Sequence, residues 1–130
     1  NKIRFNKNYY ASVKLEEPEK SFEIIKKMLS KNKKITSIIC STEFSALSAI
    51  KACNYLNLEI GKDISIITFD GPLVKDLSSP PLTAISFPVQ ELGKRAIKIL
   101  LKGHSNKNNY SNFQAKSEII ERGSVHQVRE

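Results

Sequence analysis

The chain has 130 residues, of which 40% are hydrophobic, and a formal net charge of +8. This length fits one domain or part of a larger one, and the apolar fraction is enough for a packed core, which excludes a disordered chain. The basic residues are scattered among polar and acidic ones, so they favour a solvated surface, with direct contact to nucleic acid as the alternative.

The cysteines and the hydropathy pattern indicate a soluble protein of a reducing compartment. Cys40 and Cys53 each lie within an apolar run, which predicts core thiols rather than a disulfide framework. No run approaches the ~18 apolar residues that a membrane span needs, so we expect a cytoplasmic protein without a membrane partner. The sequence opens at Asn1 without an initiator methionine, and we expect the natural protein to extend upstream.

The first half of the chain alternates between strand and helix patterns. "YASVKL" at residues 10–15 has strand character, and "EEPEKSFEIIKKMLSK" places Pro18 in the first turn of a helix. "ITSIICS" at residues 35–41 predicts a second strand, followed by a helix over "TEFSALSAIKACNYLNL" that ends before Gly61. The residues predicted to face the core are Phe22, Ile25, Met28 and Leu29 in the first helix and Phe44, Leu47, Ile50 and Cys53 in the second.

The second half continues the alternation. The predicted elements are a buried strand at 64–69, a short helix or turn at 72–77, an extended run at 82–87, a helix at 88–103, a polar loop at 104–112 and a final strand at 115–125. In the helix at 88–103, the predicted inner face consists of Val89, Leu92, Ala96 and Leu100. Alternating strands and helices predict an α/β fold, with a parallel sheet flanked by helices.

Polar and aromatic residues follow the predicted strands at their carboxyl ends. Asp70 follows the buried strand, Ser41 and Thr42 close the preceding one, and Glu16 and Phe87 stand at two further strand ends. Ligands of open α/β sheets bind at this edge, because loops and helix N-termini converge there. The Asp70 carboxylate can accept hydrogen bonds from two hydroxyls of a sugar or nucleoside, and Phe87 can stack on a ring.

Each of these residues also has an ordinary structural interpretation. Asp70 suits a turn before a glycine, and Thr42 suits a helix N-cap. Phe87 suits a core position, and Glu16 suits the first turn of a helix, where its charge complements the helix dipole. The spacing of the residues leaves both interpretations open.

Three stretches in a fixed order carry a resemblance to a known family. They are "TSIICSTEFSALSAIKACNYLNLEIGKDISIITFDG", "SSPPLTAISFPVQELGKRAIKILL" and "SEIIERGSV". Together they resemble the C-terminal part of the effector-binding region of the lactose/galactose-repressor (LacI/GalR) family of bacterial transcription regulators, over about residues 12–125.

The resemblance implies a periplasmic-binding-protein-like fold, in which two α/β lobes close on a small molecule, usually a sugar or a purine. It assigns residues 12–86 and 115–125 to the C-terminal lobe and the helix at 87–103 to the N-terminal lobe. The DNA-binding head and most of the N-terminal lobe are then absent. In the family, the acid in the place of Asp70 contacts the effector, and the segment at 41–43 approaches it.

This sequence also departs from the family pattern. The family usually has Asn-Asp where this chain has Thr42 and Glu43, often a second acid in place of Gly71, and commonly a polar residue in place of Phe87. Ring stacking by Phe87 is therefore an inference from its chemistry, and the resemblance does not imply it.

The function that the resemblance implies is a sugar- or purine-sensing repressor. Its partners would be a small-molecule effector, operator DNA through the absent head, and a second copy bound through the C-terminal lobe. A periplasmic sugar-binding protein of a transporter is the alternative. The sequence shows no nucleophile elbow and no metal-ligand spacing, so we expect no enzyme activity, cofactor or metal, and we expect His104 and His126 to be exposed.

Overall fold

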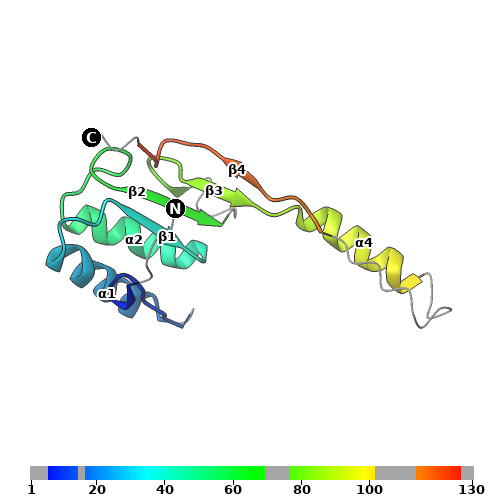
Figure 1. Ribbon diagram of the computed structural model, residues 1–130, viewed down its shortest axis with the longest axis horizontal. Coiled ribbons are helices and arrows are strands. Elements are labelled where there is room, and N and C mark those ends of the chain that lie inside the picture. The colour runs from blue at the N-terminus through cyan, green and yellow to red at the C-terminus, as the bar shows by residue number, and fades with distance from the viewer. Residues whose placement is uncertain (1–5, 15–16, 70–76, 102–113, 127–130) are drawn as a thin grey trace.

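A computed structural model of the chain describes residues 6–14, 17–69, 77–101 and 114–126, and these form a mostly parallel α/β unit (Figure 1). Its elements are a 3₁₀ helix η1 (Lys7–Tyr9), α1 (Pro18–Lys31), β1 (Ser37–Cys40), α2 (Glu43–Tyr55), β2 (Ser65–Phe69), β3 (Thr83–Ser86), α4 (Val89–Leu101) and β4 (Glu118–Ile120). The strand order is β1-β2-β3-β4. The first three strands are parallel and β4 runs antiparallel to β3, which confirms the predicted α/β class.

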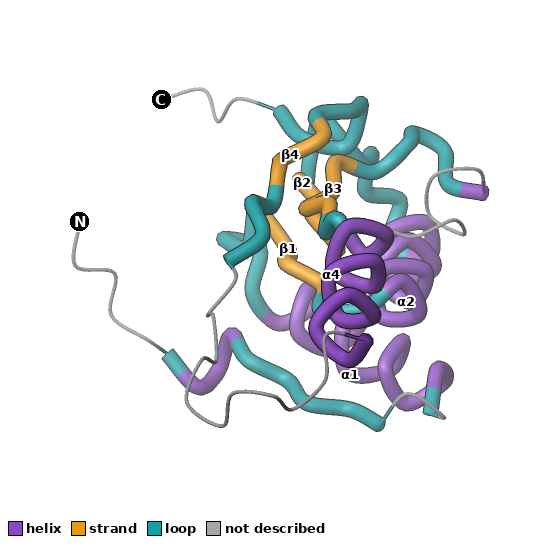
Figure 2. Tube along the Cα trace, turned by 90° about the vertical axis from the view of Figure 1, so that its right-hand side faces the viewer, coloured by secondary structure: helices purple, strands orange, loops and turns teal. Residues whose placement is uncertain are grey.

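Helices α1 and α2 pack together beside the sheet and bury one of its faces (Figures 1 and 2). Pro18 occupies the first helical position of α1, where its missing N–H costs no hydrogen bond. The buried core consists of Leu29, Cys40, Ala46, Ala49, Cys53, Ile60, Ile64, Ile66 and Leu82. The two cysteines are free and buried, as predicted.

The opposite face of the sheet carries an apolar stripe. Ile39 pairs with Ile67, and Phe69, Ile85 and Ile119 follow one another across the strands in register. Residues in register point to the same face of a sheet. The stripe is open at its two edges, because the side chain of Ile39 is 76% exposed and that of Ile119 is 67% exposed.

Helix α4 leaves the end of β3 and extends away from the sheet (Figure 1). The helix forms as predicted, but none of its residues is buried. Its predicted inner face is exposed, with Val89 at 68%, Leu92 at 39% and Leu100 at 71%. An amphipathic helix gains most of its stability from packing that face, so α4 presents an unpartnered surface.

The segment after β4 ties the sheet together through Ser124, which is completely buried. The backbone N–H of Thr83 donates to Ser124 Oγ at 2.7 Å, and Ser124 Oγ donates to the carbonyl of Ile66 at 2.6 Å. The N–H of Ile66 in turn donates to the Ser124 carbonyl at 2.9 Å. One serine therefore links the segment to both β2 and β3.

The predicted exposure of His126 was wrong. It is half-buried rather than exposed, its Nδ1 lies 3.0 Å from Ser65 Oγ, and its backbone N–H donates to the same oxygen. The contact spans 61 positions in the sequence. No local pattern around His126 could have indicated it.

Three predicted segments also differ from the structure. Residues 10–14, predicted as part of a strand, are paired with neither β1 nor any other strand of the described sheet. The final strand covers only Glu118–Ile120 of the predicted 115–125. The predicted inner face of α2 was wrong at Phe44, which is 48% exposed, because the helix packs closely through Ala46, Ala49 and Ala52 instead.

Two further predictions concern parts of the chain that the structure does not describe. The loop at 104–112, with His104, lies outside the described residues, and so does almost all of the turn at 72–77. Among the helices of the described ranges, none has the length and apolar character needed to span a membrane.

Candidate functional site

The carboxyl edge of the parallel strands brings several of the predicted site residues together. Ser41 and Thr42 follow β1, Phe69 ends β2, and Phe87 follows β3. Neighbouring strand ends are joined directly, since the Thr68 hydroxyl donates to the carbonyl of Thr42 at 3.4 Å. The edge is thus a continuous surface over three strands.

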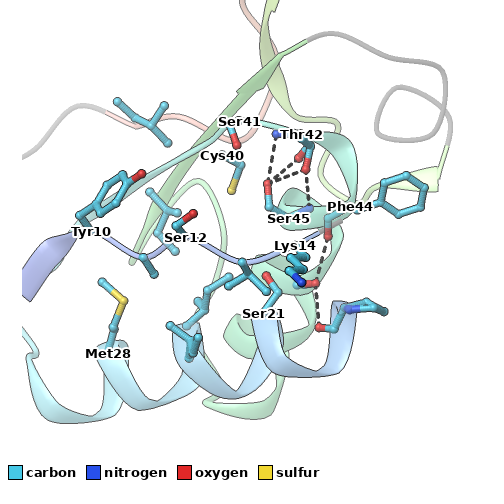
Figure 3. Close-up of a pocket in the computed structure, with 18 of the residues that line it drawn as sticks. Tyr10, Ser12, Lys14, Ser21, Met28, Cys40, Ser41, Thr42, Phe44 and Ser45 are labelled. Atoms are coloured by element: carbon cyan, nitrogen blue, oxygen red, sulfur yellow. Dashed lines mark hydrogen bonds between the residues drawn. The ribbon is translucent and has the colours of Figure 1, made fainter. Parts of the chain in front are cut away.

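Thr42 is the N-cap of α2 and forms a reciprocal capping box with Ser45 (Figure 3). The Ser45 N–H donates to Thr42 Oγ1 at 3.2 Å, and the Thr42 N–H donates to Ser45 Oγ at 3.2 Å. The two hydroxyls lie 3.1 Å apart, and the Ser45 hydroxyl donates to the Thr42 carbonyl at 2.7 Å. This network leaves Thr42 Oγ1 one free lone pair, with which it can accept a hydrogen bond.

A cavity of about 320 Å³ opens beside this cap (Figure 3). Its walls are the segment at residues 9–14 on one side, the end of β1 with Ser41 and Thr42 on another, and α1 beneath. Ser41 is exposed, whereas Cys40 is buried. The cavity is large enough for a small molecule.

Both cysteine thiols are unsuited to nucleophilic chemistry. Burial raises the pKa of Cys40 to about 11, against a smaller opposing effect of the hydrogen bond with Ser45. Burial likewise raises the pKa of Cys53 to about 11. Because only the thiolate reacts, both groups stay inert near neutral pH. Within the described ranges, no three His, Cys, Asp or Glu side chains gather as metal ligands would.

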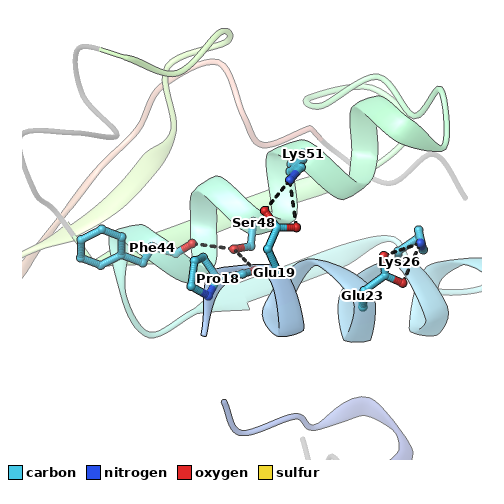
Figure 4. A network of polar contacts seen from close by, with 7 residues as sticks. All are labelled: Pro18, Glu19, Glu23, Lys26, Phe44, Ser48 and Lys51. Atoms are coloured by element: carbon cyan, nitrogen blue, oxygen red, sulfur yellow. Dashed lines mark hydrogen bonds and ion pairs between the residues drawn. The ribbon is translucent and has the colours of Figure 1, made fainter. Parts of the chain in front are cut away.

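The floor of the cavity is held by contacts between α1 and α2 (Figure 4). Ser48 Oγ lies 3.0 Å from the Phe44 carbonyl and 3.3 Å from the Pro18 carbonyl. At the surface, Lys51 Nζ pairs with the Glu19 carboxylate at 2.9 Å. Such exposed pairs contribute little, so burial of the small residues of α2 fixes the helix pair.

Phe87 does not lie alone at the edge. Its ring stacks on that of Phe69, with 5.2 Å between ring centroids and 29° between the ring planes. Phe69 is half-buried and Phe87 is 47% exposed. Sequence reasoning named Phe87 but missed Phe69, although both follow the alternation that places Ile85 on the same face.

Two predicted site residues cannot be placed. Asp70 and Glu16 both lie outside the described residues. The neighbouring Glu17 is the N-cap residue of α1, but its side chain makes no capping hydrogen bond, and its carboxylate pairs with Lys20 at 3.0 Å. Of the predicted site residues, the structure therefore describes Ser41, Thr42 and Phe87.

Comparison with a family model gives a match over nearly the whole chain. Residues 4–125 match the model of the periplasmic binding protein-like domain. Among curated proteins, the chain is 35% identical over 105 residues to the HTH-type transcriptional repressor PurR of Aliivibrio salmonicida, covering 80% of this chain and 32% of that protein. It is 30% identical over 118 residues to the HTH-type transcriptional regulator RegA of Clostridium saccharobutylicum, covering 90% and 35%.

The solved structures that the chain resembles are also transcriptional regulators. A LacI family transcriptional regulator from Bifidobacterium animalis subsp. lactis matches with a TM-score of 0.76 and 27% identity, over 86% of this chain and 41% of that one. A PurR family transcriptional regulator from Vibrio parahaemolyticus matches with a TM-score of 0.69 and 25% identity, over 82% and 39%. The chain spans about a third of the length of the curated relatives that it matches.

Proposed function

Because the chain belongs to the periplasmic binding protein-like domain family, in the form found in LacI/GalR regulators, we propose that it is part of the effector-binding region of a ligand-responsive transcription regulator. The match over residues 4–125 is the observation that supports this most. The relatives named above are transcriptional regulators, which favours this function over a transporter's solute-binding protein and over an enzyme.

In this proposal, residues 12–86 and 115–125 belong to the C-terminal lobe, of which 12–86 are the latter part, and the helix at 87–103 belongs to the N-terminal lobe. The exposure of the apolar side of α4 supports the second assignment, since that side needs a partner that the described chain does not supply. The pairing of β4 with β3 supports the return of the chain to the C-terminal lobe.

The effector is a sugar or a nucleoside-like molecule that binds at the carboxyl edge of the sheet. Asp70 holds it by accepting hydrogen bonds from its hydroxyls, while Ser41 and Thr42 approach it from the end of β1 and Glu16 approaches it from the segment before α1. Phe87 stacks on its ring. The adjacency of the ends of β1, β2 and β3 supports this grouping.

The mechanism is a shift between two arrangements of the lobes. An effector that binds one arrangement more tightly favours it, and the DNA-binding heads of a homodimer then present a different spacing to the operator. Such coupling typically changes affinity by about 5- to 150-fold. Dimerisation occurs through the C-terminal lobe, and the protein acts in the cytoplasm.

The test begins with the natural gene product that contains this chain. Sequence-specific DNA is selected from a random duplex library, and its affinity is measured by fluorescence anisotropy with and without sugars and purines. We expect one compound to change the affinity at least ~5-fold, the lower end of typical coupling. Tight binding of a sugar by a protein that selects no DNA would instead identify a solute-binding protein.

The control is Asp70→Ala. We expect this variant to keep its DNA affinity and lose the response to the small molecule. A variant that melts at a much lower temperature and loses both properties would show that Asp70 has a structural role in a turn, and would remove it from the effector site.

A further inference from the structure

Lysines without an ion-pair partner among the described residues gather at the C-terminal end of α1. Lys27 and Lys31 are exposed and lie one helical turn apart, and Lys33 and Lys34 are exposed in the turn that follows. The ion pairs of the described residues involve other lysines, namely Lys20, Lys26, Lys51 and Lys62. Positions 24–42 contain no acidic residue, so the sequence supplies no local counter-charge to these four lysines.

A contact between residues 23 positions apart brings two tyrosines beside these lysines. The Asn32 side chain, at the C-cap of α1, donates from Nδ2 to the Tyr9 hydroxyl at 3.0 Å. Its Oδ1 accepts from the backbone N–H of Lys34 at 3.0 Å. One amide group therefore holds Tyr9 beside the turn that carries the lysines, and Tyr10 follows directly. The two tyrosines are 57% and 64% exposed.

The lysines of α1 lie on the same side of the helix as the tyrosines. Ile24 and Met28 line the cavity of Figure 3 together with both tyrosines. Lys27 lies three residues after Ile24, and Lys31 lies three residues after Met28, a spacing that places side chains on one side of a helix. Basic and aromatic side chains thus form one surface, which we call the Lys–Tyr surface and which consists of Tyr9, Tyr10, Lys27, Lys31, Lys33 and Lys34.

We propose that the Lys–Tyr surface binds single-stranded nucleic acid. Ammonium groups attract the phosphates and exposed aromatic rings stack on the bases, which is the combination by which proteins bind single strands without sequence preference. The bases of a duplex are already stacked on one another, so they offer the tyrosine rings no face. An acidic protein would use the charges and leave both rings without a role.

This surface is separate from the proposed effector site. The turn after α1 leads into the start of β1, so the Lys–Tyr surface lies at the amino edge of the sheet. Ser41 and Thr42 follow the other end of the same strand. The proposal therefore goes beyond the proposed function and does not depend on it.

The experiment measures the fluorescence anisotropy of labelled oligo-dT of about 16 nucleotides with the natural gene product that contains this chain. Salt is varied from about 50 to 200 mM, because phosphate contacts weaken as salt rises. We expect the logarithm of the affinity to fall linearly with the logarithm of the salt concentration, with a slope of about −0.7 for each phosphate contact. Absence of binding at about 50 mM salt overturns the proposal.

Charge variants locate the contact. The first variant replaces three lysines of the surface: Lys27→Gln, Lys31→Gln and Lys34→Gln. The control removes the same charge from three exposed lysines that pair with glutamates: Lys20→Gln, Lys51→Gln and Lys62→Gln. We expect the first variant to reduce the magnitude of the salt slope by about 2, and the control to leave it unchanged. Equal losses in the two variants would show that binding follows total charge, which overturns the proposal.

Variants of Tyr9 separate stacking from charge. Tyr9→Phe and Tyr9→Leu both lose the hydroxyl that Asn32 contacts, but only Tyr9→Phe keeps an aromatic ring. We expect Tyr9→Leu to bind oligo-dT about 5- to 150-fold more weakly than Tyr9→Phe, the range for the loss of one stacked base. Equal affinities of the two variants would contradict stacking and overturn the proposal.

Two further polyanions test the class of partner. The affinity for a duplex of the same length should change little in the variant that lacks the three surface lysines, and polyglutamate should displace oligo-dT poorly at equal charge concentration. A duplex whose affinity falls as much as that of oligo-dT, or polyglutamate that displaces it efficiently, would assign the surface to another kind of polyanion and overturn the proposal.

Discussion

Substitution of Ser124 by alanine tests how strongly its hydroxyl holds the segment after β4 to strands β2 and β3. The hydroxyl is completely buried, accepts from the Thr83 N–H at 2.7 Å and donates to the Ile66 carbonyl at 2.6 Å. Ser124→Ala leaves a buried N–H without its partner, which costs about 1–3 kcal/mol, and it also removes the bond to the carbonyl. We expect a total loss of about 2–4 kcal/mol in the free energy of unfolding, a large share of the stability of a small domain.

The assay is urea unfolding followed by circular dichroism on the 130-residue chain, with thermal melts in parallel. A loss of this size lowers the melting temperature by roughly 8–15 °C for a domain of this length. The matched control is Ser117→Ala, an exposed serine beside β4, which should shift stability by less than about 0.5 kcal/mol. If Ser124→Ala also changes the free energy of unfolding by less than about 0.5 kcal/mol, the hydrogen bonds of the Ser124 hydroxyl to β2 and β3 are not what stabilises the sheet.

Three further predictions follow from burial and backbone geometry. Gly61→Ala should lower the melting temperature, because Gly61 has a φ of +83° and an added Cβ would overlap a neighbouring carbonyl oxygen. The control Gly93→Ala in α4 adds a Cβ that meets no other atom, so it should be neutral or stabilising. Equal changes in the melting temperatures of the two variants would contradict this. Cys40 and Cys53 should react with a thiol reagent only after urea unfolds the chain. Because their folded pKa of about 11 exceeds the unfolded value of 9.0, the folded state binds more protons above pH 9, so the free energy of unfolding should fall between pH 9 and 11; a flat profile in that range would count against burial. The isolated chain should self-associate in sedimentation velocity, because the open sheet face and α4 expose apolar residues, and a monomer at all concentrations would argue against that.

Local sequence signals predicted most of the elements. Pro18 marks the first turn of α1, and the β-branched runs around residues 38 and 66 mark two parallel strands. These signals act within a few residues of each other, so they can be recognised without knowledge of the fold.

The errors arose where a distant segment decides the outcome. The strand pattern at residues 10–14 requires pairing with another strand, and in the structure this segment lies across the cavity from the edge strand β1 instead of pairing with it. Phe44 has the spacing of a core residue, but the close packing of α1 and the sheet around α2 admits alanines and leaves Phe44 exposed. His126 is fixed by Ser65, which is 61 positions away.

The sequence predicted that the candidate site lies at the carboxyl edge of the sheet, but it did not predict the side-chain contacts there. The strand ends fixed the positions of Ser41, Thr42 and Phe87, because parallel strands finish on the same side of a sheet. The capping box on Thr42 and the stacking of Phe69 on Phe87 depend on side-chain geometry that the pattern of residues does not contain.

The most direct test of the proposed function is reciprocal binding. The affinity of the gene product for its ring effector is measured by calorimetry, first alone and then with a saturating amount of its selected DNA. Linkage requires that DNA change the effector affinity by the same factor, about 5- to 150-fold, by which the effector changes the DNA affinity. Equal effector affinities with and without DNA would contradict the account of this chain as part of an allosteric regulator.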